Sequence, residues 1–196
     1  MNKHLIVTGI AVLLLMVGLS GCTDIISNIT DENSNYKPII NIEVFEKEIH
    51  NLVNNERMNN GLPSLEYDTQ LSNIARSHSQ DMANRNYFDH NSPEGLSPTD
   101  RAIAVGYPIY KDYGTYYTEG IAENIFLNYL YDSITYTNGV PSYDWLTQSE
   151  IAYSTVDGWM ASYGHRQNIL ESTYDKEGIG VAISSEHEVY ITQDFW

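Results

Sequence analysis

Apolar residues in the first half of the chain recur at helical spacing. Near residue 42 they lie three or four positions apart, which predicts one apolar helix face formed by Ile42, Phe45, Ile49, Leu52 and Val53. The following "NNGLP" predicts that this helix ends at Gly61. A second helix is predicted to begin after Asp68, a suitable N-cap, with a face formed by Leu71, Ile74, Ala75, His78 and Met82.

The second half of the chain combines an irregular stretch, one helix and two β-rich runs. The segment "EGIAENI" fits either a strand or a short helix, and residues 128–146 predict an irregular excursion with a turn at "NG". A helix is expected from about Thr147 to Ser162, and "IGVAIS" and "EVYITQDFW" then predict a hairpin. Helices that precede strands, without regular alternation, predict an α+β fold with an antiparallel sheet.

The N-terminus has the pattern of a targeting segment. A short positive start, "MNKH", precedes the continuous apolar run "LIVTGIAVLLLMVGL" and then "LSGC". We predict a signal peptide over residues 1–21, and the pattern resembles a bacterial-type lipobox that ends at Cys22, the residue that would be lipidated. The alternative is an uncleaved anchor helix. Both place the domain (residues 41–196), preceded by a polar tether (residues 22–40), outside the membrane. The lipobox pattern indicates a prokaryote, and we expect the domain either on the extracellular face of the cell membrane, held by the lipid, or secreted.

Composition excludes two classes of interaction. The chain has 196 residues, a formal net charge of −16 and a single cysteine. Nucleic acid is not an expected partner, because neutralising phosphates requires clustered Lys and Arg. With one cysteine, the chain cannot form an intramolecular disulfide.

Five motifs occur in a fixed order along the chain. They are "LVNNERMNNGLPSLEYDTQLSNIARSHSQDM", "YFDHNSPEG", "AENI", "DGWMASYGHRQNIL" and the pair "IGVAI" and "VYITQDF". The series is similar to the CAP superfamily, also called the SCP domain, which includes cysteine-rich secretory proteins, antigen 5 and pathogenesis-related 1 proteins. It is most similar to the prokaryotic branch without disulfides. Over about residues 42 to 196, the resemblance implies a three-layer α-β-α sandwich with a central antiparallel sheet.

The resemblance also implies a cleft lined by two histidines and two acidic residues. Carried over by motif, the histidines are His90 of "YFDHNSP" and His165 of "YGHRQNIL", and one acid is Glu123 of "AENI". The second acid falls at Ser162, so one carboxylate of the family's set is missing here.

These residue types leave three chemical interpretations open. Two imidazoles and a carboxylate are ligand types for Zn²⁺ or another divalent cation, so the resemblance suggests a metal site at His90 and His165, with Glu123. The alternative is a hydrogen-bonded network of the same three side chains. Ser162, His165 and Glu123 also have the residue types of a nucleophile, a base and an orienting acid, which are the candidates for catalysis.

Other residues are expected to support this cleft. His78 is either a buried histidine with a satisfied hydrogen bond or a partner that orients His90. Asn124 is expected to tie a loop to the backbone, and Arg166 either pairs with a carboxylate or is solvated. Tyrosines at 107–117 and at Tyr129, Tyr131 and Tyr136 either form a binding rim or reflect local composition.

The interpretation that combines these observations is a cell-surface lipoprotein with one CAP domain that acts as a binding module. Its ligand would be an envelope component, a lipid or a protein. The alternatives are a metal-dependent or Ser/His hydrolase of peptide or ester bonds, and an interaction scaffold without cleft chemistry.

Overall fold

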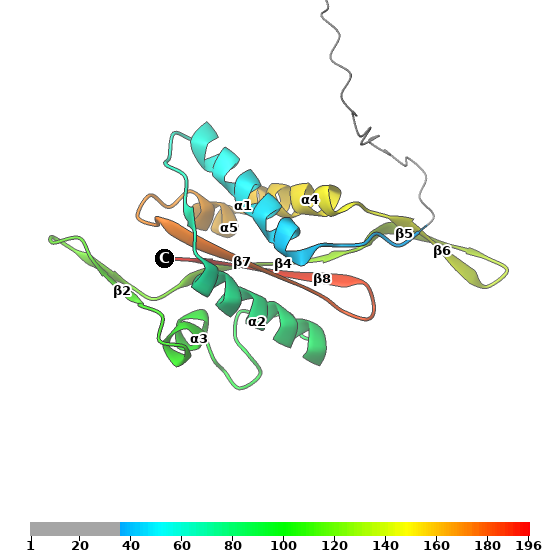
Figure 1. The fold of residues 1–196 in the computed structure, drawn as a ribbon, viewed down its shortest axis with the longest axis horizontal. Coiled ribbons are helices and arrows are strands. Elements are labelled where there is room, and N and C mark those ends of the chain that lie inside the picture. Colours follow the sequence, from blue (N-terminus) through cyan, green and yellow to red (C-terminus); the bar gives the residue numbers. More distant parts are fainter. Residues whose placement is uncertain (1–35) are drawn as a thin grey trace, which may run out of the picture. The chain divides into compact units, whose positions relative to one another are not determined.

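A computed structural model describes residues 36–196, so the predicted signal peptide and Cys22 lie outside the described residues. Helices cover both faces of a central sheet, which gives three layers (Figure 1). The predicted α+β sandwich is therefore confirmed. No helix in residues 36–196 is long and apolar enough to cross a membrane.

The central sheet has the strand order β1-β7-β8-β4. The strands β7 (Lys176–Ile183) and β8 (Glu188–Phe195) form the predicted hairpin, and β4 (Ala122–Tyr129) pairs antiparallel with β8. The two-residue strand β1 (Glu66–Tyr67) pairs parallel with β7. The segment "EGIAENI", which fitted either a strand or a short helix, thus contributes the start of an edge strand.

One helical layer holds the main hydrophobic core against the sheet. It consists of α1 (Ile42–Asn59), α4 (Gln148–Ala161) and the short helix α5 (Tyr163–Ile169). Asn41 caps α1, and Thr147 forms a capping box with Glu150 at the start of α4. Trp159 is fully buried in this core, and its indole N–H donates to the carbonyl of Ile125 (3.2 Å).

The opposite layer consists of α2 (Thr69–Arg85) and α3 (Pro98–Ala104). The predicted N-cap of α2 is confirmed, because the Asp68 side chain accepts from the backbone N–H of Leu71. The helix lies unusually close to β7, since a Cβ atom at Gly178 or Gly180 would collide with the α2 backbone. These two glycines allow the helix to seal this face of the sheet.

Two small hairpins lie outside the central sheet, at opposite ends of the domain (Figure 1). One pairs β2 (Tyr110–Asp112) with β3 (Tyr117–Glu119), and the other pairs β5 (Tyr131–Thr137) with β6 (Val140–Trp145). The predicted irregular excursion at 128–146 is therefore wrong. The turn at "NG" is correct, and Asn138 and Gly139 both have positive φ (52° and 80°), as a two-residue hairpin turn requires.

Candidate functional site

The edge strand β4 presents two neighbouring polar residues to opposite faces of the sheet. Glu123 faces the layer of α2 and α3, where it meets His90 and Arg101. Asn124 faces the layer of α5, where it meets His165. This alternation, which follows from the two-residue period of a strand, places the predicted site residues around one edge of the sheet.

Glu123 forms the centre of a charged cluster. Its side chain is 1% exposed, one carboxylate oxygen lies 2.8 Å from His90 Nδ1, and the other forms an ion pair with the Arg101 guanidinium. The His90 side chain is 48% exposed. Because Nδ1 faces the carboxylate, the second ring nitrogen, Nε2, is the one left to meet a ligand.

The loop that carries His90 is held from two sides. His78, buried on α2, has its Nε2 atom 3.0 Å from the carbonyl oxygen of Asp89. Arg101 also donates to the carbonyl oxygen of His90 (2.8 Å). His78 thus fixes the backbone beside His90, while its Nδ1 atom has no hydrogen-bond partner in the described part of the chain.

The structure adds two residues that the sequence analysis did not identify, Arg101 and Asp194. Asp194 on β8 lies directly opposite Glu123 in the strand register and is fully buried. Neither of its carboxyl oxygens has a hydrogen-bond partner within residues 36–196. Burial, together with the charge of Glu123, raises the pKa of Asp194 well above its usual range, so it keeps its proton to higher pH than an exposed aspartate.

The opposite face of β4 carries a network of amides. Asn124 donates to the carbonyl oxygen of His165 (3.1 Å) and to Gln193 Oε1 (3.0 Å), and it accepts from Asn168 (2.9 Å). The helix predicted in this region ended at about Ser162, whereas in the structure His165 lies within a second helix, α5. The network fixes the backbone of this helix against the sheet.

Two other predicted residues lie at the junction of α4 and α5. Arg166 donates to the carbonyl oxygen of Met160 (2.6 Å), so it ties the two helices together and, over the described range, forms no ion pair with a carboxylate. Ser162 separates the two helices, and its side chain makes no capping hydrogen bond.

The two site histidines differ in their electrostatics. The hydrogen bond that the His90 ring donates to Glu123 raises the pKa of His90 above its ordinary value of 6.5, against the effect of burial. Burial lowers the pKa of His165, and the nearby charge of His90 lowers it further. As the pH falls from neutral to mild acid, His90 is therefore the ring that takes up a proton first.

The contacts of Glu123 bear on the metal and catalytic interpretations of the site. Glu123 already uses both oxygens, and no group of three or more His, Cys, Asp or Glu side chains in residues 36–196 is placed to hold a metal ion. A zinc site with all three side chains as ligands does not fit this arrangement, in which Glu123 instead orients the His90 ring. The triad of Ser162, His165 and Glu123 has no hydrogen bond between its members in the described chain, since Glu123 pairs with His90.

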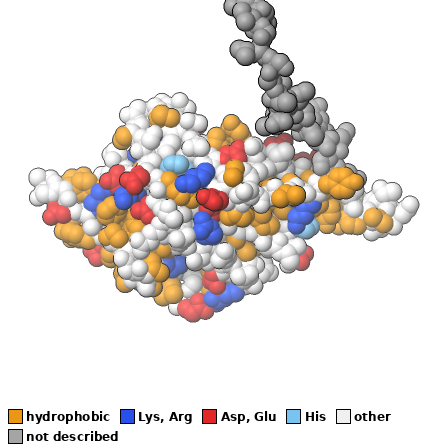
Figure 2. All heavy atoms as spheres, viewed as in Figure 1, with side chains coloured by type: hydrophobic (Ala, Val, Ile, Leu, Met, Phe, Trp, Pro, Cys, Tyr) orange, Lys and Arg blue, Asp and Glu red, His pale blue; other side chains and the backbone are white. Residues whose placement is uncertain are grey.

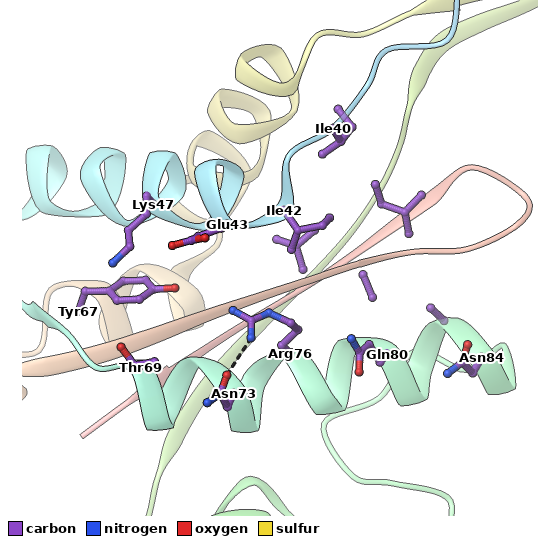
Figure 3. A pocket seen from close by; sticks show the side chains of 14 residues that line it. Ile40, Ile42, Glu43, Lys47, Tyr67, Thr69, Asn73, Arg76, Gln80 and Asn84 are labelled. Atoms are coloured by element: carbon purple, nitrogen blue, oxygen red, sulfur yellow. Dashed lines mark hydrogen bonds between the residues drawn. The ribbon is translucent and has the colours of Figure 1, made fainter.

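A groove lies away from this cluster, between α1 and α2 and beside the part of β7 that β1 does not pair (Figure 3). Its volume is about 830 Å³, and Lys47 and Arg76 point into it from the two helices. The buried Glu46 pairs with Arg76 and accepts from the backbone N–H of Val181 (3.1 Å). This side chain occupies a donor that an added strand would need, so the groove is poorly suited to strand addition.

Comparison with known proteins identifies the family of this domain. Residues 50–195 match the model of the cysteine-rich secretory protein family, CAP. The chain is 36% identical over 139 residues to the uncharacterized protein YkwD of Bacillus subtilis (strain 168), which covers 71% of this chain and 43% of that protein. It is 33% identical over 150 residues to the uncharacterized membrane protein YlbC of the same organism, covering 76% and 34%. The chain thus spans less than half the length of either relative.

Solved structures show the same fold. An extracellular protein containing a SCP domain from Bacillus anthracis str. Ames aligns with a TM-score of 0.53 and 25% identity, over 81% of this chain and 44% of that one. An outer surface protein from Borrelia burgdorferi aligns with a TM-score of 0.56 and 14% identity, over 82% and 97%. The second likeness concerns the fold alone.

Proposed function

The chain belongs to the cysteine-rich secretory protein (CAP) family, and on this basis we propose that it is a binding module at the cell surface, anchored by a lipid on Cys22. Its ligand, an envelope component, a lipid or a protein, is captured at the cluster of His90, Glu123 and His165. The extracellular protein from Bacillus anthracis that it resembles supports the proposed location.

The observation that carries this proposal is the way in which His90 is held. The half-exposed ring is fixed by a buried carboxylate, and that carboxylate is fixed in turn by Arg101. A ring nitrogen held at the surface by buried partners is a preorganised contact for a ligand. A solvated histidine without a role would not need a buried carboxylate that is itself paired with an arginine.

The second part of the proposal is a divalent cation bound at this site. His90 and His165 would be the protein ligands, and Glu123 would orient the His90 ring and increase its basicity. Such an ion would present open positions to oxygen atoms of a ligand. The remaining ligands of the ion would come from water or from the captured molecule.

A Zn²⁺ titration by calorimetry at neutral pH tests this site. We expect binding of one ion that is lost in both His90→Ala and His165→Ala, whereas His187→Ala, which changes a histidine outside the site, keeps it. Binding that ignores both site variants, or no binding, contradicts the divalent-ion part of the proposal.

The binding function itself is tested with envelope glycans and lipids as probes. Saturable binding that is lost in His90→Ala, without any change in the probe, is the expected result. Hydrolysis of a peptide or ester that disappears in a folded His165→Ala variant would favour the hydrolase alternative instead.

A further inference from the structure

The hairpin of β5 and β6 has one aromatic face and one polar face. The strand register pairs Ile134 with Tyr143, Tyr136 with Pro141 and Tyr131 with Trp145. Residues directly opposite each other share a face, so these six side chains lie on one side of the hairpin. The other side carries small polar residues and one carboxylate, namely Ser133, Thr135, Thr137, Ser142 and Asp144, with Val140 at the turn.

The aromatic face is packed at its root and open at its tip. At the root, the Tyr143 and Trp145 rings stack with centroids 4.6 Å apart, and the His187 ring lies 5.2 Å from Trp145. At the tip, Tyr136 is 69% exposed and Pro141 is also exposed. The exposed part of this face has no counterpart in residues 36–196 that covers it.

The hairpin also lacks positive charge. Residues 129–146 contain no Lys or Arg, and their charged side chains are Asp132 and Asp144. Figure 2 shows only hydrophobic and other uncharged side chains over the outer part of this hairpin. An anionic surface is therefore not the partner that this face fits, because nothing on it would attract phosphate groups.

The point at which the chain enters the domain indicates that this face lies near the membrane surface. Lys37 Nζ lies 3.1 Å from Nδ1 of His187, which packs on the root of the hairpin. Lys37 lies fifteen positions after Cys22, and a fully extended chain of that length spans at most about 54 Å. A lipid on Cys22 would thus keep the root of this hairpin within about 54 Å of the bilayer.

We propose that the aromatic face of the β5–β6 hairpin docks on the uncharged interfacial region of the bilayer that holds the lipid anchor. This inference rests on the proposed function in one respect, the lipid on Cys22. Tyr and Trp prefer the membrane–water interface, where the ring is buried and the polar end stays hydrated. Docking orients the domain, so that the hairpin faces the membrane and the sheet edge with His90 is held at a defined height above it.

The single cysteine makes a direct experiment feasible. In the lipidated full chain, Pro141→Cys and Ser142→Cys each introduce the only free thiol, on the aromatic and the polar face respectively. Each variant is labelled with an environment-sensitive fluorophore and reconstituted into phosphatidylcholine vesicles. Quenching by iodide is compared with that of the same label in a Cys22→Ser chain in buffer.

We expect iodide quenching at position 141 to fall about fivefold or more in vesicles, because the anion does not enter the interface, while quenching at position 142 changes little. Adding Tyr136→Ser should restore quenching at 141, and Tyr110→Ser, on the other hairpin, should not. High salt should leave the result unchanged. Equal quenching of both positions in vesicles and buffer overturns the proposal.

Two further results would also overturn the proposal. Protection of position 141 by added envelope glycan, but not by vesicles, would make the face a carbohydrate-binding surface. Protection that grows with protein concentration without vesicles would make it a contact between two copies.

The experiment tests the proposed lipid on Cys22 and the proposed docking face separately. Mass spectrometry that finds Cys22 unmodified contradicts the proposed anchor. The Cys22→Ser chain labelled at 141 is then titrated with the same vesicles, where protection still supports the docking face and its absence overturns it.

Discussion

Each face of strand β4 holds one buried polar side chain in place, and the two faces do so with different kinds of interaction. On one face Glu123 is held by a cation and an imidazole, beside the buried Asp194, whose pKa is raised by burial. On the other face Asn124 is held by neutral amides and a backbone carbonyl. Both side chains are buried, and both fix an element that carries one of the two site histidines.

The difference separates a titratable support from a permanent one. In a buried charged cluster, the electrostatic interaction energy is large, and it depends on pH and on the presence of every member. An amide network contributes less per group, and the three hydrogen bonds of Asn124 join neutral groups that do not titrate between mild acid and neutral pH. His90 therefore has a support that responds to pH, and His165 has one that does not.

The largest effect is expected from removing the cation of the charged face. Arg101→Ala leaves Glu123 buried beside Asp194 without its guanidinium, and we expect a loss of about 3–5 kcal/mol in the free energy of unfolding. The loss should be smaller at pH 5 than at pH 8, because the pKa of His90 is raised and its protonated ring then partly compensates the unpaired carboxylate. Urea unfolding at both pH values measures it.

A matched arginine provides the control for this prediction. Arg85 pairs with Glu94 at 2.6 Å, but both side chains are well exposed, so Arg85→Ala should change stability little. Replacing both partners, as Arg101→Met with Glu123→Leu, should recover most of the stability lost in Arg101→Ala. Equal effects of the two single arginine variants would show that the charged cluster is not a buried support.

The amide face should respond with a smaller loss that does not depend on pH. Asn124→Ala removes three hydrogen bonds and leaves buried partners unsatisfied, so we expect about 1–3 kcal/mol of destabilisation. The same unfolding measurement at pH 5.5 and pH 8 should give the same loss. Asn128→Ala, which breaks a bond to Ser154 at the surface, is the control with little expected change.

The sequence predicted the main helices and strands better than it predicted the outer hairpin and the contacts of the site. Apolar periodicity located α1, α2 and α4, and the two β-rich runs located β7 and β8, because each pattern repeats over several turns or pairs. The β5–β6 hairpin was missed because its polar face consists of Ser, Thr and Asp, residues that also mark loops. Its aromatic face becomes apparent only once the register is known.

The site was predicted only as far as its motifs reach. Motif order pointed to His90, Glu123 and His165 as candidates, but Arg101 stands in "DRAIAV", where nothing distinguishes an arginine that pairs with a buried carboxylate from a solvated one. Asp194 gave a weaker indication, as a carboxylate inside the β-rich run "VYITQDFW". Strand pairing places it opposite Glu123, and pairing between distant strands cannot be read from either segment alone.

A smaller effect should appear in the titration of the two site histidines. NMR titration of the imidazole signals should give a pKa above 6.5 for His90 and below 6.5 for His165. Stability from the His90–Glu123 pair is fully present below pH 6.5 and is lost as the pH rises through the folded pKa of His90. For His165 the sign is opposite, and stability falls as the pH drops below 6.5 toward its folded pKa.

The variant Glu123→Gln connects this titration to the charged face. It should bring the pKa of His90 back toward 6.5, because its largest cause is removed, while His165 changes less. Assignment of the signals comes from His90→Gln and His165→Gln. Identical pKa values for the two rings in the unaltered chain would contradict the difference between the two faces.

The smallest effect on stability is expected from His90→Gln. The ring is half exposed, and Glu123 keeps its ion pair with Arg101, so the free energy of unfolding should change by no more than about 0.5 kcal/mol. Binding of Zn²⁺ or of an envelope probe should nevertheless be lost, because the presented ring nitrogen is gone. If binding falls while stability stays, the buried Glu123 of β4 acts to hold the His90 ring for a ligand. If stability falls as far as in Arg101→Ala, His90 is instead a structural member of the cluster, and the charged face would serve the fold alone.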